Sequence, residues 1–450
     1  MLCTLNRRTQ LIVLLCCLSS AASAQWQEKV LYSFQGGNDG SLPGGGAIRD
    51  KIGHLYGETV EGGSTACPPG WCGTVYELSP SAQNGAPWTE TLLYVFKGHD
   101  QNDGSSPSGG LISDGKGNLY GTAGYGGSGP CVLFGTPTGC GAVFELSPPK
   151  QEGGIWTEAV LYSFQGGNDG DLPIGPLVFD KAGNLYGATL FGGGQGTSCN
   201  VFYGGNCGTI FELSPPQAKG GQWTEKVLHS FAGIATGSQY GDGASPNGGL
   251  VLDSQGAIYG TTFLGGYNCP HNSNQGCGTV FRLKPPEVEV GSWNERVLYC
   301  FKAGADGGNP AAGLTLHGQL YGTSDAAVFR MVPPKAGVGF WAIALLYVLG
   351  NNAYDPAGAL TFDANGNLYG TTEYSDTYHG TVFSLKPSGA KGNSLTFDML
   401  YGFQGPPDGG QPAARLIFDN DGNLYGTTTQ GGSSTACGFQ GCGTVVELSP

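Results

Sequence analysis

The chain has 450 residues, of which 83 are glycine, and only 12% of its residues are charged. Its net charge of −14 opposes binding to phosphate backbones and to anionic lipid surfaces. The glycines follow no three-residue period, which excludes a collagen helix, and 39% regularly spaced hydrophobic residues exclude a disordered chain.

The N-terminus has the features of a secretory signal peptide. Arg7 and Arg8 precede an apolar run over residues 11–18 that is too short to span a bilayer, and Ala22-Ser-Ala24 is typical of a cleavage site. We expect residues 1–24 to be removed and residues 25–450 to form a single domain. That mature chain has 18 basic and 34 acidic residues, a net charge of −16. We expect it to be secreted, to the periplasm or the extracellular space, as a monomer with no membrane span or C-terminal anchor.

Seven copies of one unit, each of roughly 50–70 residues, follow the signal peptide. Each copy has four short apolar runs that are rich in β-branched and aromatic residues and are bounded by Gly, Asn, Asp and Pro, as strands are. In the fullest copy the four runs cover residues 159–164, 176–180, 184–189 and 208–215.

Tandem four-stranded units predict an all-β fold, a seven-bladed β-propeller. The mature chain begins with the first run of the unit, Val30–Phe34, and ends with the fourth run, Val445–Leu448. Pairing of these two runs would complete the last blade and close the ring, so that no edge strand stays exposed. An open solenoid would instead need distinct capping repeats, which the sequence does not contain.

The recurring runs resemble a known bacterial repeat. Leu-Tyr-Gly-Thr-Thr at 368–372 and 424–428, and Gly-Thr-Val-Phe at 278–281 and 380–383, are similar to the Gloeo/Verruco-type (GloVer) tandem repeat of exported bacterial proteins. Members of that group carry various C-terminal anchors, and this chain departs from them by having none. The resemblance implies export and a repeat architecture, and it implies no established enzyme activity. The fifth and sixth units depart most, because they are shorter and Asp325-Ala-Ala-Val328 replaces the Gly-Thr approach to the fourth run.

Eleven cysteines follow the signal peptide, and ten of them form local pairs in the loop between the third and fourth runs. In an exported protein such pairs predict disulfides. The spacings, without paired histidines nearby, do not fit a zinc site. The predicted disulfides are Cys67–Cys72, Cys131–Cys140, Cys199–Cys207, Cys269–Cys277 and Cys437–Cys442. Cys300 is left over, and we expect it to be a half-buried free thiol.

An acidic loop of the form Asp-Gly-x-x-Pro joins the first run to the second, and in a propeller it would emerge on the same face as the cysteine loops. Clustered carboxylates there could bind Ca²⁺, the one cofactor the sequence suggests. The alternative is that each aspartate caps its own turn. The candidate calcium ligands are Asp39, Asp103, Asp169, Asp242, Asp306 and Asp408. A second set of aspartates lies in hairpins of the opposite face and is expected to be structural: Asp114, Asp180, Asp253, Asp363 and Asp419.

Aromatic residues that do not recur in register are the candidate ligand-binding side chains, because rings on rigid, disulfide-closed loops suit stacking against sugars. These residues are Trp71, Tyr125, Phe134, Phe202, Tyr203, Tyr267 and Phe439. The six histidines occupy unrelated positions of the repeat, and the chain has no G-x-S-x-G or Walker motif, so we predict no catalytic residue.

The sequence therefore favours a secreted, non-catalytic binding or scaffold module whose disulfide-stapled loop face takes an extracellular glycan or protein. Nucleic acid is not an expected partner. Two alternatives stay open. One is an exported polysaccharide hydrolase or lyase with its site in the central channel, because propeller loops can bring distant carboxylates together. The other is a structural envelope protein.

Overall fold

The computed structural model describes residues 26–450, except residues 65–66, 68–71, 82–86, 152, 195–206, 219, 235–240, 267–274, 289–290, 336–338, 351–354, 357 and 389–393. The predicted signal peptide lies outside the described residues. The described part is built from strands, and its helices are three short 3-10 turns, η1 (Gly37–Asp39), η2 (His99–Gln101) and η3 (Gly438–Gln440). None of them has the length or the apolar character to cross a bilayer.

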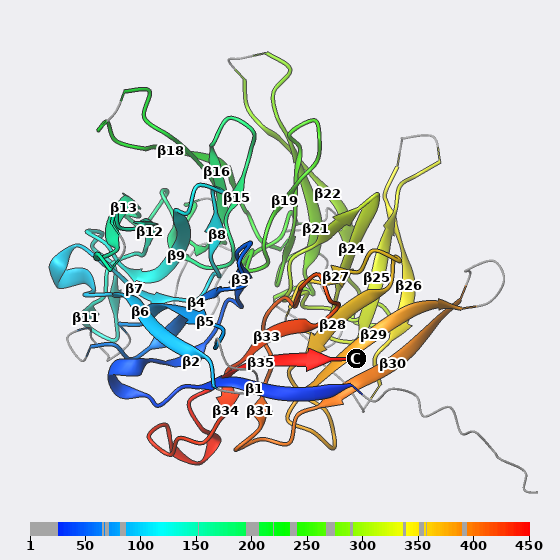
Figure 1. Ribbon diagram of the computed structural model, residues 1–450. Coiled ribbons are helices and arrows are strands. Elements are labelled where there is room, and N and C mark those ends of the chain that lie inside the picture. Colours follow the sequence, from blue (N-terminus) through cyan, green and yellow to red (C-terminus); the bar gives the residue numbers. More distant parts are fainter. Residues whose placement is uncertain are drawn as a thin grey trace, which may run out of the picture.

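Seven antiparallel sheets form the blades of an all-β propeller, numbered I to VII along the chain (Figure 1). Blade I contains β2 (Ser41–Pro43), β3 (Ile48–Arg49), β4 (Leu55–Glu61), β5 (Thr74–Ser79) and β6 (Thr89–Val95). Blade II contains β7 (Gly104–Pro107), β8 (Ile112–Ser113), β9 (Leu119–Gly126), β12 (Ala142–Ser147) and β13 (Thr157–Ser163). Blade III contains β14 (Asp171–Pro173), β15 (Val178–Phe179), β16 (Leu185–Phe191), β17 (Thr209–Ser214) and β18 (Thr224–Ser230).

The remaining four blades have four strands each. Blade IV contains β19 (Val251–Leu252), β20 (Ile258–Thr262), β21 (Thr279–Lys284) and β22 (Asn294–Cys300). Blade V contains β23 (Thr315–His317), β24 (Gln319–Thr323), β25 (Ala327–Val332) and β26 (Ala342–Val348). Blade VI contains β27 (Thr361–Phe362), β28 (Leu368–Thr372), β29 (Thr381–Ser388) and β30 (Ser394–Gly402). Blade VII contains β32 (Ile417–Phe418), β33 (Leu424–Thr428), β35 (Thr444–Ser449) and β1 (Gln27–Ser33).

The innermost strand of blades I to III is interrupted. In blade I, β2 and β3 both pair with β4, through Ser41 opposite Glu61 and Ile48 opposite Tyr56, and the chain between them leaves the ladder. The sequence predicted only the second half of this strand. Two further strand pairs lie in the loops, β10 (Val132–Leu133) with β11 (Thr136–Pro137), and β31 (Gly409–Gly410) with β34 (Gln430–Gly431).

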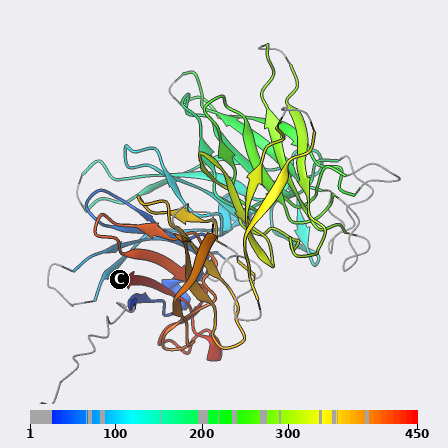
Figure 2. The same ribbon diagram turned by 90° about the vertical axis from the view of Figure 1, so that its right-hand side faces the viewer.

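The N-terminal strand closes the ring. β1 pairs antiparallel with β35, in a register that runs from Gln27 opposite Ser449 to Ser33 opposite Thr444. In Figures 1 and 2 the blue start of the described chain accordingly lies beside its red end. This pairing supplies blade VII with its outer strand, as the sequence predicted.

Aromatic side chains hold neighbouring blades together. The phenylalanine that follows an outer strand is fully buried and meets an aromatic ring of the next blade edge to face, as Phe34 meets Tyr76 with ring centroids 5.1 Å apart. The same contact joins Phe96 to Phe144, Phe164 to Phe211, Phe231 to Phe281 and Phe301 to Phe329. Each such pair contributes about 0.5–1.5 kcal/mol beyond its buried area. Tryptophans before the outer strands pack against the preceding blade, as Trp156 does on Tyr56.

Removal of the closing strand should destabilise the whole ring. We expect a mature chain that lacks residues 25–35 to unfold at a clearly lower temperature, because it exposes the edge of β35 and loses the buried Leu31 and Phe34. The single change Phe34→Ala should cost about 3–5 kcal/mol. Phe134→Ala is the control, since that ring is 82% exposed. Thermal unfolding measures both effects, and an unchanged melting temperature of the truncated chain would refute ring closure.

Candidate functional site

Two sets of loops emerge on one end of the ring, which we call the loop face. In blade I, residues 62–73 connect β4 to β5, and residues 34–40 bring the chain from β1 of blade VII to β2. These two loops touch, because the Gly63 amide donates a hydrogen bond to the Gly37 carbonyl at 2.8 Å. The cysteine loops and the acidic loops therefore share a face, as expected. The other end carries the tight turns between the innermost strand and its neighbour, and we call it the hairpin face.

Disulfides close the cysteine loops. The structure contains Cys67–Cys72, Cys131–Cys140 and Cys437–Cys442, which confirms three of the predicted pairs. Cys207 and Cys277 are also disulfide-bonded, while their predicted partners Cys199 and Cys269 lie outside the described residues. Cys300 is a half-buried free cysteine, as predicted, and burial raises the pKa of its thiol to about 11. Such a thiol is largely protonated at neutral pH and is a poor nucleophile.

In every blade the segment at or before the innermost strand contains one non-glycine residue with a left-handed backbone, which lies within a strand only in blades I to III. The φ values are between 45° and 59°, and the residues are Leu42, Ser106, Leu172, Ser245, Asn309, Asp355 and Gln411. This conformation costs about 1–2 kcal/mol for a residue with a side chain. In six of these seven residues the amide donates a hydrogen bond of 2.6–3.1 Å to a carbonyl of the preceding blade. We call this hydrogen bond the interblade latch. Its acceptor is the second cysteine of the loop in five cases, and His379 in the sixth.

The glycine after the latch carbonyl is required by close packing. Gly73, for example, has φ +82°, and a Cβ at this position would overlap the ring of Pro107 in the next blade. The same glycine–proline contact recurs at Gly141, Gly208, Gly278, Gly380 and Gly443. A disulfide that ends just before this glycine therefore holds the latch carbonyl at the seam between two blades.

The acidic-loop aspartates are bound within their own loops. Asp39 accepts a hydrogen bond from the Tyr32 hydroxyl at 2.7 Å and another from the Gln35 amide at 2.5 Å. Tyrosines of the outer strands contact Asp103, Asp169, Asp306 and Asp408 in the same way, and His229 contacts Asp242 at 3.0 Å. These contacts support the turn-capping interpretation. No three of these carboxylates come within metal-binding reach of one another in the described residues, and calcium binding at this loop stays a prediction.

A row of half-buried glutamates was not singled out in the sequence. Glu28, Glu90, Glu158, Glu225 and Glu295 each follow a tryptophan by two positions, which is the signal that could have revealed them. One carboxylate oxygen of each is buried without a hydrogen-bond partner. Burial raises the pKa of each of these glutamates to about 7, and a neighbouring loop aspartate adds to the effect in every case, for example Asp39 next to Glu90.

The hairpin-face aspartates are structural, as expected. In Asp363 the carboxylate accepts hydrogen bonds from the amides of Asn365 and Asn367, from the Asn367 side chain and from the Tyr369 hydroxyl. These donors hold the pKa of Asp363 below its usual value. Asp114, Asp180, Asp253 and Asp419 cap their turns in the same manner.

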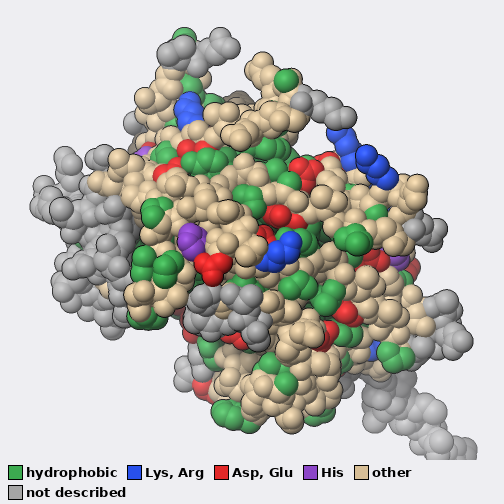
Figure 3. All heavy atoms as spheres, turned by 90° about the vertical axis from the view of Figure 1, so that its left-hand side faces the viewer, with side chains coloured by type: hydrophobic (Ala, Val, Ile, Leu, Met, Phe, Trp, Pro, Cys, Tyr) green, Lys and Arg blue, Asp and Glu red, His purple; other side chains and the backbone are tan. Residues whose placement is uncertain are grey.

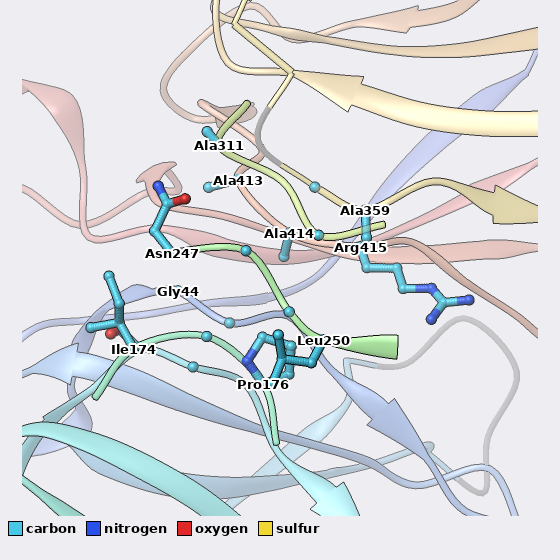
Figure 4. A pocket seen from close by; sticks show the side chains of 18 of the residues that line it. Gly44, Ile174, Pro176, Asn247, Leu250, Ala311, Ala359, Ala413, Ala414 and Arg415 are labelled. Atoms are coloured by element: carbon cyan, nitrogen blue, oxygen red, sulfur yellow. The ribbon is translucent and has the colours of Figure 1, made fainter. Parts of the chain in front are cut away.

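The segments that lead into β3, β8, β15, β19, β23, β27 and β32, one from each blade, surround a central cavity of about 340 Å³ (Figure 4). Most of its wall is glycine and alanine, so the backbone itself lines the cavity. The larger lining side chains include Ile174, Pro176, Asn247, Leu250 and Arg415. Figure 4 places Ile174 and Asn247 on one side of the cavity and Arg415 on the opposite side.

A second cavity, of about 330 Å³, adjoins the first, since Ala311 lines both. It is bounded by blades IV, V and VI and is lined by Asp325, Asp355 and Glu373. Burial raises the pKa of all three acids, and each is raised further by another acid, for example Glu373 by Asp355. This acidic cavity lies where the fifth and sixth units depart from the repeat.

Of the predicted aromatic candidates, the structure describes Tyr125, Phe134 and Phe439. Phe134 is 82% exposed between Cys131 and Cys140, and Phe439 is 91% exposed between Cys437 and Cys442. Tyr125 is half-buried in β9. Since Phe134 belongs to blade II and Phe439 to blade VII, the two exposed rings lie on separate loops. Trp71, Phe202, Tyr203 and Tyr267 lie outside the described residues.

A comparison with known protein families agrees with the repeat architecture of the chain. The profile of the Gloeobacter/Verrucomicrobia repeat family covers residues 18–241 and again residues 133–329. The chain belongs to this repeat family. The match confirms the resemblance inferred from the Leu-Tyr-Gly and Gly-Thr-Val-Phe runs. No curated protein sequence matches the chain.

Solved propeller structures resemble this Gloeobacter/Verrucomicrobia repeat protein only distantly. An oxidoreductase of glucose dehydrogenase type from Thermus thermophilus is 14% identical, with a TM-score of 0.45 over 94% of this chain and 100% of that one. A protein of unknown function from Dyadobacter fermentans is 10% identical, with a TM-score of 0.43 over 94% and 98%. The calcium structure of a family AA12 carbohydrate-active enzyme from Trichoderma reesei is 12% identical, with a TM-score of 0.42 over 95% and 96%. Structural similarity at this level supports the fold of this chain and no conclusion about its ligand or activity.

Within the Gloeobacter/Verrucomicrobia repeat, single blades carry charged residues where their counterparts are uncharged. Glu58 stands where the other units have threonine or alanine. It is fully buried, accepts a hydrogen bond from the Gly110 amide of the next blade at 2.6 Å, and has a pKa raised to about 8 by burial. Arg415 likewise stands where the other units have glycine, alanine or proline. Such departures are the candidates for function, because the repeated residues already account for the ring.

The glutamate row predicts that the protein is more stable in mild acid than in base. The pKa of these groups is higher in the folded chain than in the unfolded one, so their contribution is fully present below about pH 4.5 and is lost as the pH rises towards 7. Each group changes the free energy of unfolding by less than about 1.4 kcal/mol per pH unit between the two pKa values, because solvent screens these half-buried side chains. We therefore expect a higher free energy of unfolding at pH 5 than at pH 8, measured by denaturant titration.

Two variants test the source of this pH dependence. Glu158→Gln should reduce the difference between pH 5 and pH 8, because it removes one of the raised groups. Glu287→Gln should leave the difference unchanged, since that side chain is 85% exposed. Equal stability at the two pH values, or greater stability at pH 8, would show that the glutamates titrate normally.

Proposed function

We propose that the protein is an exported binding module that presents its loop face to an extracellular glycan and releases it unchanged. The observation that carries this proposal is the pair of exposed phenylalanines, Phe134 and Phe439, each held inside a ring closed by a disulfide. An aromatic ring fixed on a stapled loop loses little conformational freedom when a sugar stacks on it. The disulfides also fit an oxidising compartment outside the cytoplasm.

Charge supports a glycan over other partners. The face in Figure 3 shows acidic side chains scattered among few basic ones, and the chain as a whole has a net charge of −14. Such a surface disfavours polyanions, whereas sugar hydroxyls and ring faces bind through hydrogen bonds and stacking.

The acidic cavity favours a second candidate, an exported polysaccharide hydrolase or lyase. Asp325, Asp355 and Glu373 line one cavity beside the central one, and their pKa values are all raised. Acids with raised pKa values in a cleft are a feature of general acid catalysis. In this alternative one of the three would protonate a leaving oxygen, and Asp355→Asn would abolish turnover.

One experiment separates the two candidates. The mature, oxidised protein is incubated with a panel of plant and bacterial polysaccharides, and each tube is scored for retained protein and for new reducing ends. We expect retention without new reducing ends. Phe134→Ala and Phe439→Ala should each weaken retention about tenfold or more, since stacking and apolar burial of one ring contribute at least about 1.4 kcal/mol.

Ile52→Ala is the matched control, because Ile52 is 75% exposed in a hairpin-face turn and should leave retention unchanged. New reducing ends that disappear in Asp355→Asn would establish the enzyme instead. Absence of retention on every polysaccharide would refute the glycan proposal.

A further inference from the structure

Blade IV carries a group of basic residues that no other blade has. Arg282 in β21 lies directly opposite Arg296 in β22, and Lys284 follows Arg282 by two positions, so the three side chains share one face of the sheet. We call these three residues the basic cluster. Each of the other blades has at most one basic residue at the corresponding three positions.

The repeat usually places an acid at the position of Arg282. The acids in the other blades are Glu77, Glu145, Glu212 and Glu447. In blade III, Glu212 opposes Lys226 across the ladder, which is a favourable pair of opposite charges. Blade IV instead places Arg282 opposite Arg296, and like charges in directly opposite positions destabilise a sheet. The ring can be built without this arrangement, so the repeat does not explain it.

The basic cluster lies between blades IV and V, near the hairpin face. Arg296 donates a hydrogen bond from Nη2 to the Gly339 carbonyl of blade V at 2.5 Å. Arg282 lies opposite Tyr259, whose ring packs against blade V and whose hydroxyl donates to the turn aspartate Asp253. Burial and Asp253 raise the pKa of Tyr259, and the neighbouring Arg282 opposes that rise. Both arginines are therefore held at the same contact between two blades.

The charges of the two arginines are not balanced by acids. In the described part of the chain neither guanidinium forms a salt bridge, and Lys284 pairs only with the exposed Glu287, at 3.2 Å. The Nε atom of Arg282 is buried without a hydrogen-bond partner, and both arginines are half-buried. Two partly desolvated cations on one face of a sheet are stabilised when an anion binds to both of them.

We propose that the basic cluster binds a small tetrahedral dianion, which is inorganic phosphate or sulfate, or the phosphate monoester of a small molecule. Guanidinium groups match the oxygen atoms of such an anion through paired hydrogen bonds. Two guanidiniums balance two negative charges, whereas a carboxylate would leave one arginine unbalanced. The ligand is small, because the net charge of −14 repels a long polyanion. This site is separate from the loop face and goes beyond the proposed function.

The test measures binding of sodium phosphate, sodium sulfate, glucose 6-phosphate and sodium acetate to the mature, oxidised protein by titration calorimetry in a chloride buffer. At about pH 8 a phosphate monoester is doubly charged. Wild-type protein should bind the dianions and not acetate. Arg282→Glu should weaken this binding about tenfold or more, because a hydrogen bond between charged groups contributes at least that factor.

Arg282→Glu has a second expected effect, which a merely structural arginine would not show. The variant restores the pair of opposite charges that blade III has, so it should melt at a higher temperature than the wild type when no dianion is present. Lys284→Gln changes an exposed side chain and keeps the test valid if Arg282→Glu does not fold. It should weaken binding about two- to fivefold, which is the contribution of an exposed ion pair. Lys226→Gln is the matched control, because Lys226 has the position of Arg296 in blade III, and it should leave binding unchanged.

Each outcome of the titrations decides the inference. Dianion binding that is lost in Arg282→Glu and unchanged in Lys226→Gln supports it. Tighter binding of glucose 6-phosphate than of inorganic phosphate would identify the monoester as the ligand, and equal or weaker binding would identify the free ion. Absence of binding by all three dianions, equal affinity for acetate, or equal affinity of Arg282→Glu and the wild type would overturn the inference. None of these results changes the glycan proposal, which the loop face carries.

Discussion

The antiparallel pairing of β1 with β35 determines the architecture of this chain, because it converts a row of seven similar sheets into a closed ring. In an open row, the last blade would lack its outer strand and β35 would present unpaired amides and carbonyls. Closure also brings blade VII against blade I, so that Phe34 packs against Tyr76 and the Leu42 amide reaches the Cys442 carbonyl. The central cavity exists only because the ring closes around it.

The residues that recur from unit to unit form the contacts between neighbouring blades. Three residues act together at most of these contacts. The disulfide-bonded cysteine positions the carbonyl that accepts the latch hydrogen bond from the next blade. The glycine that follows the cysteine leaves room for the proline ring of that blade. The left-handed residue beside that proline, such as Leu42, has a strained backbone that this hydrogen bond helps to offset. Function is then expected where the symmetry is broken, at Glu58, Arg415 and the acids of blades V and VI.

Much of the fold could be predicted from the sequence. The four runs of the unit, the ring closure and the cysteine pairs follow from periodicity and from local spacing, since each depends on residues that are close in sequence or repeated. The interruption of the innermost strand could not be predicted, because it depends on how seven segments crowd around one axis. The glutamate row was likewise missed, although the Trp-x-Glu pattern of residues such as Trp156 and Glu158 was visible, because its burial arises from the neighbouring blade.

The candidate site was predicted less well, for a physical reason. The sequence directed attention to aspartates that recur, and the structure shows Asp39 and its counterparts bound by backbone amides and by a tyrosine of the outer strand, or by His229 in the case of Asp242. The residues that line the central cavity are mostly glycine and alanine, which carry no chemical signal in a sequence. Arg415 departs from the glycine, alanine or proline of the other units, and only the structure shows that this residue borders the central cavity.

Hydrogen–deuterium exchange of the mature protein tests the closed ring most directly. If β1 completes blade VII, its amides should exchange as slowly as those of β13, the outer strand of blade II, and both should be protected together with β35. Rapid exchange across β1 while β13 stays protected would show that the N-terminal strand does not pair with the last blade, and would contradict the closed ring that surrounds the central cavity.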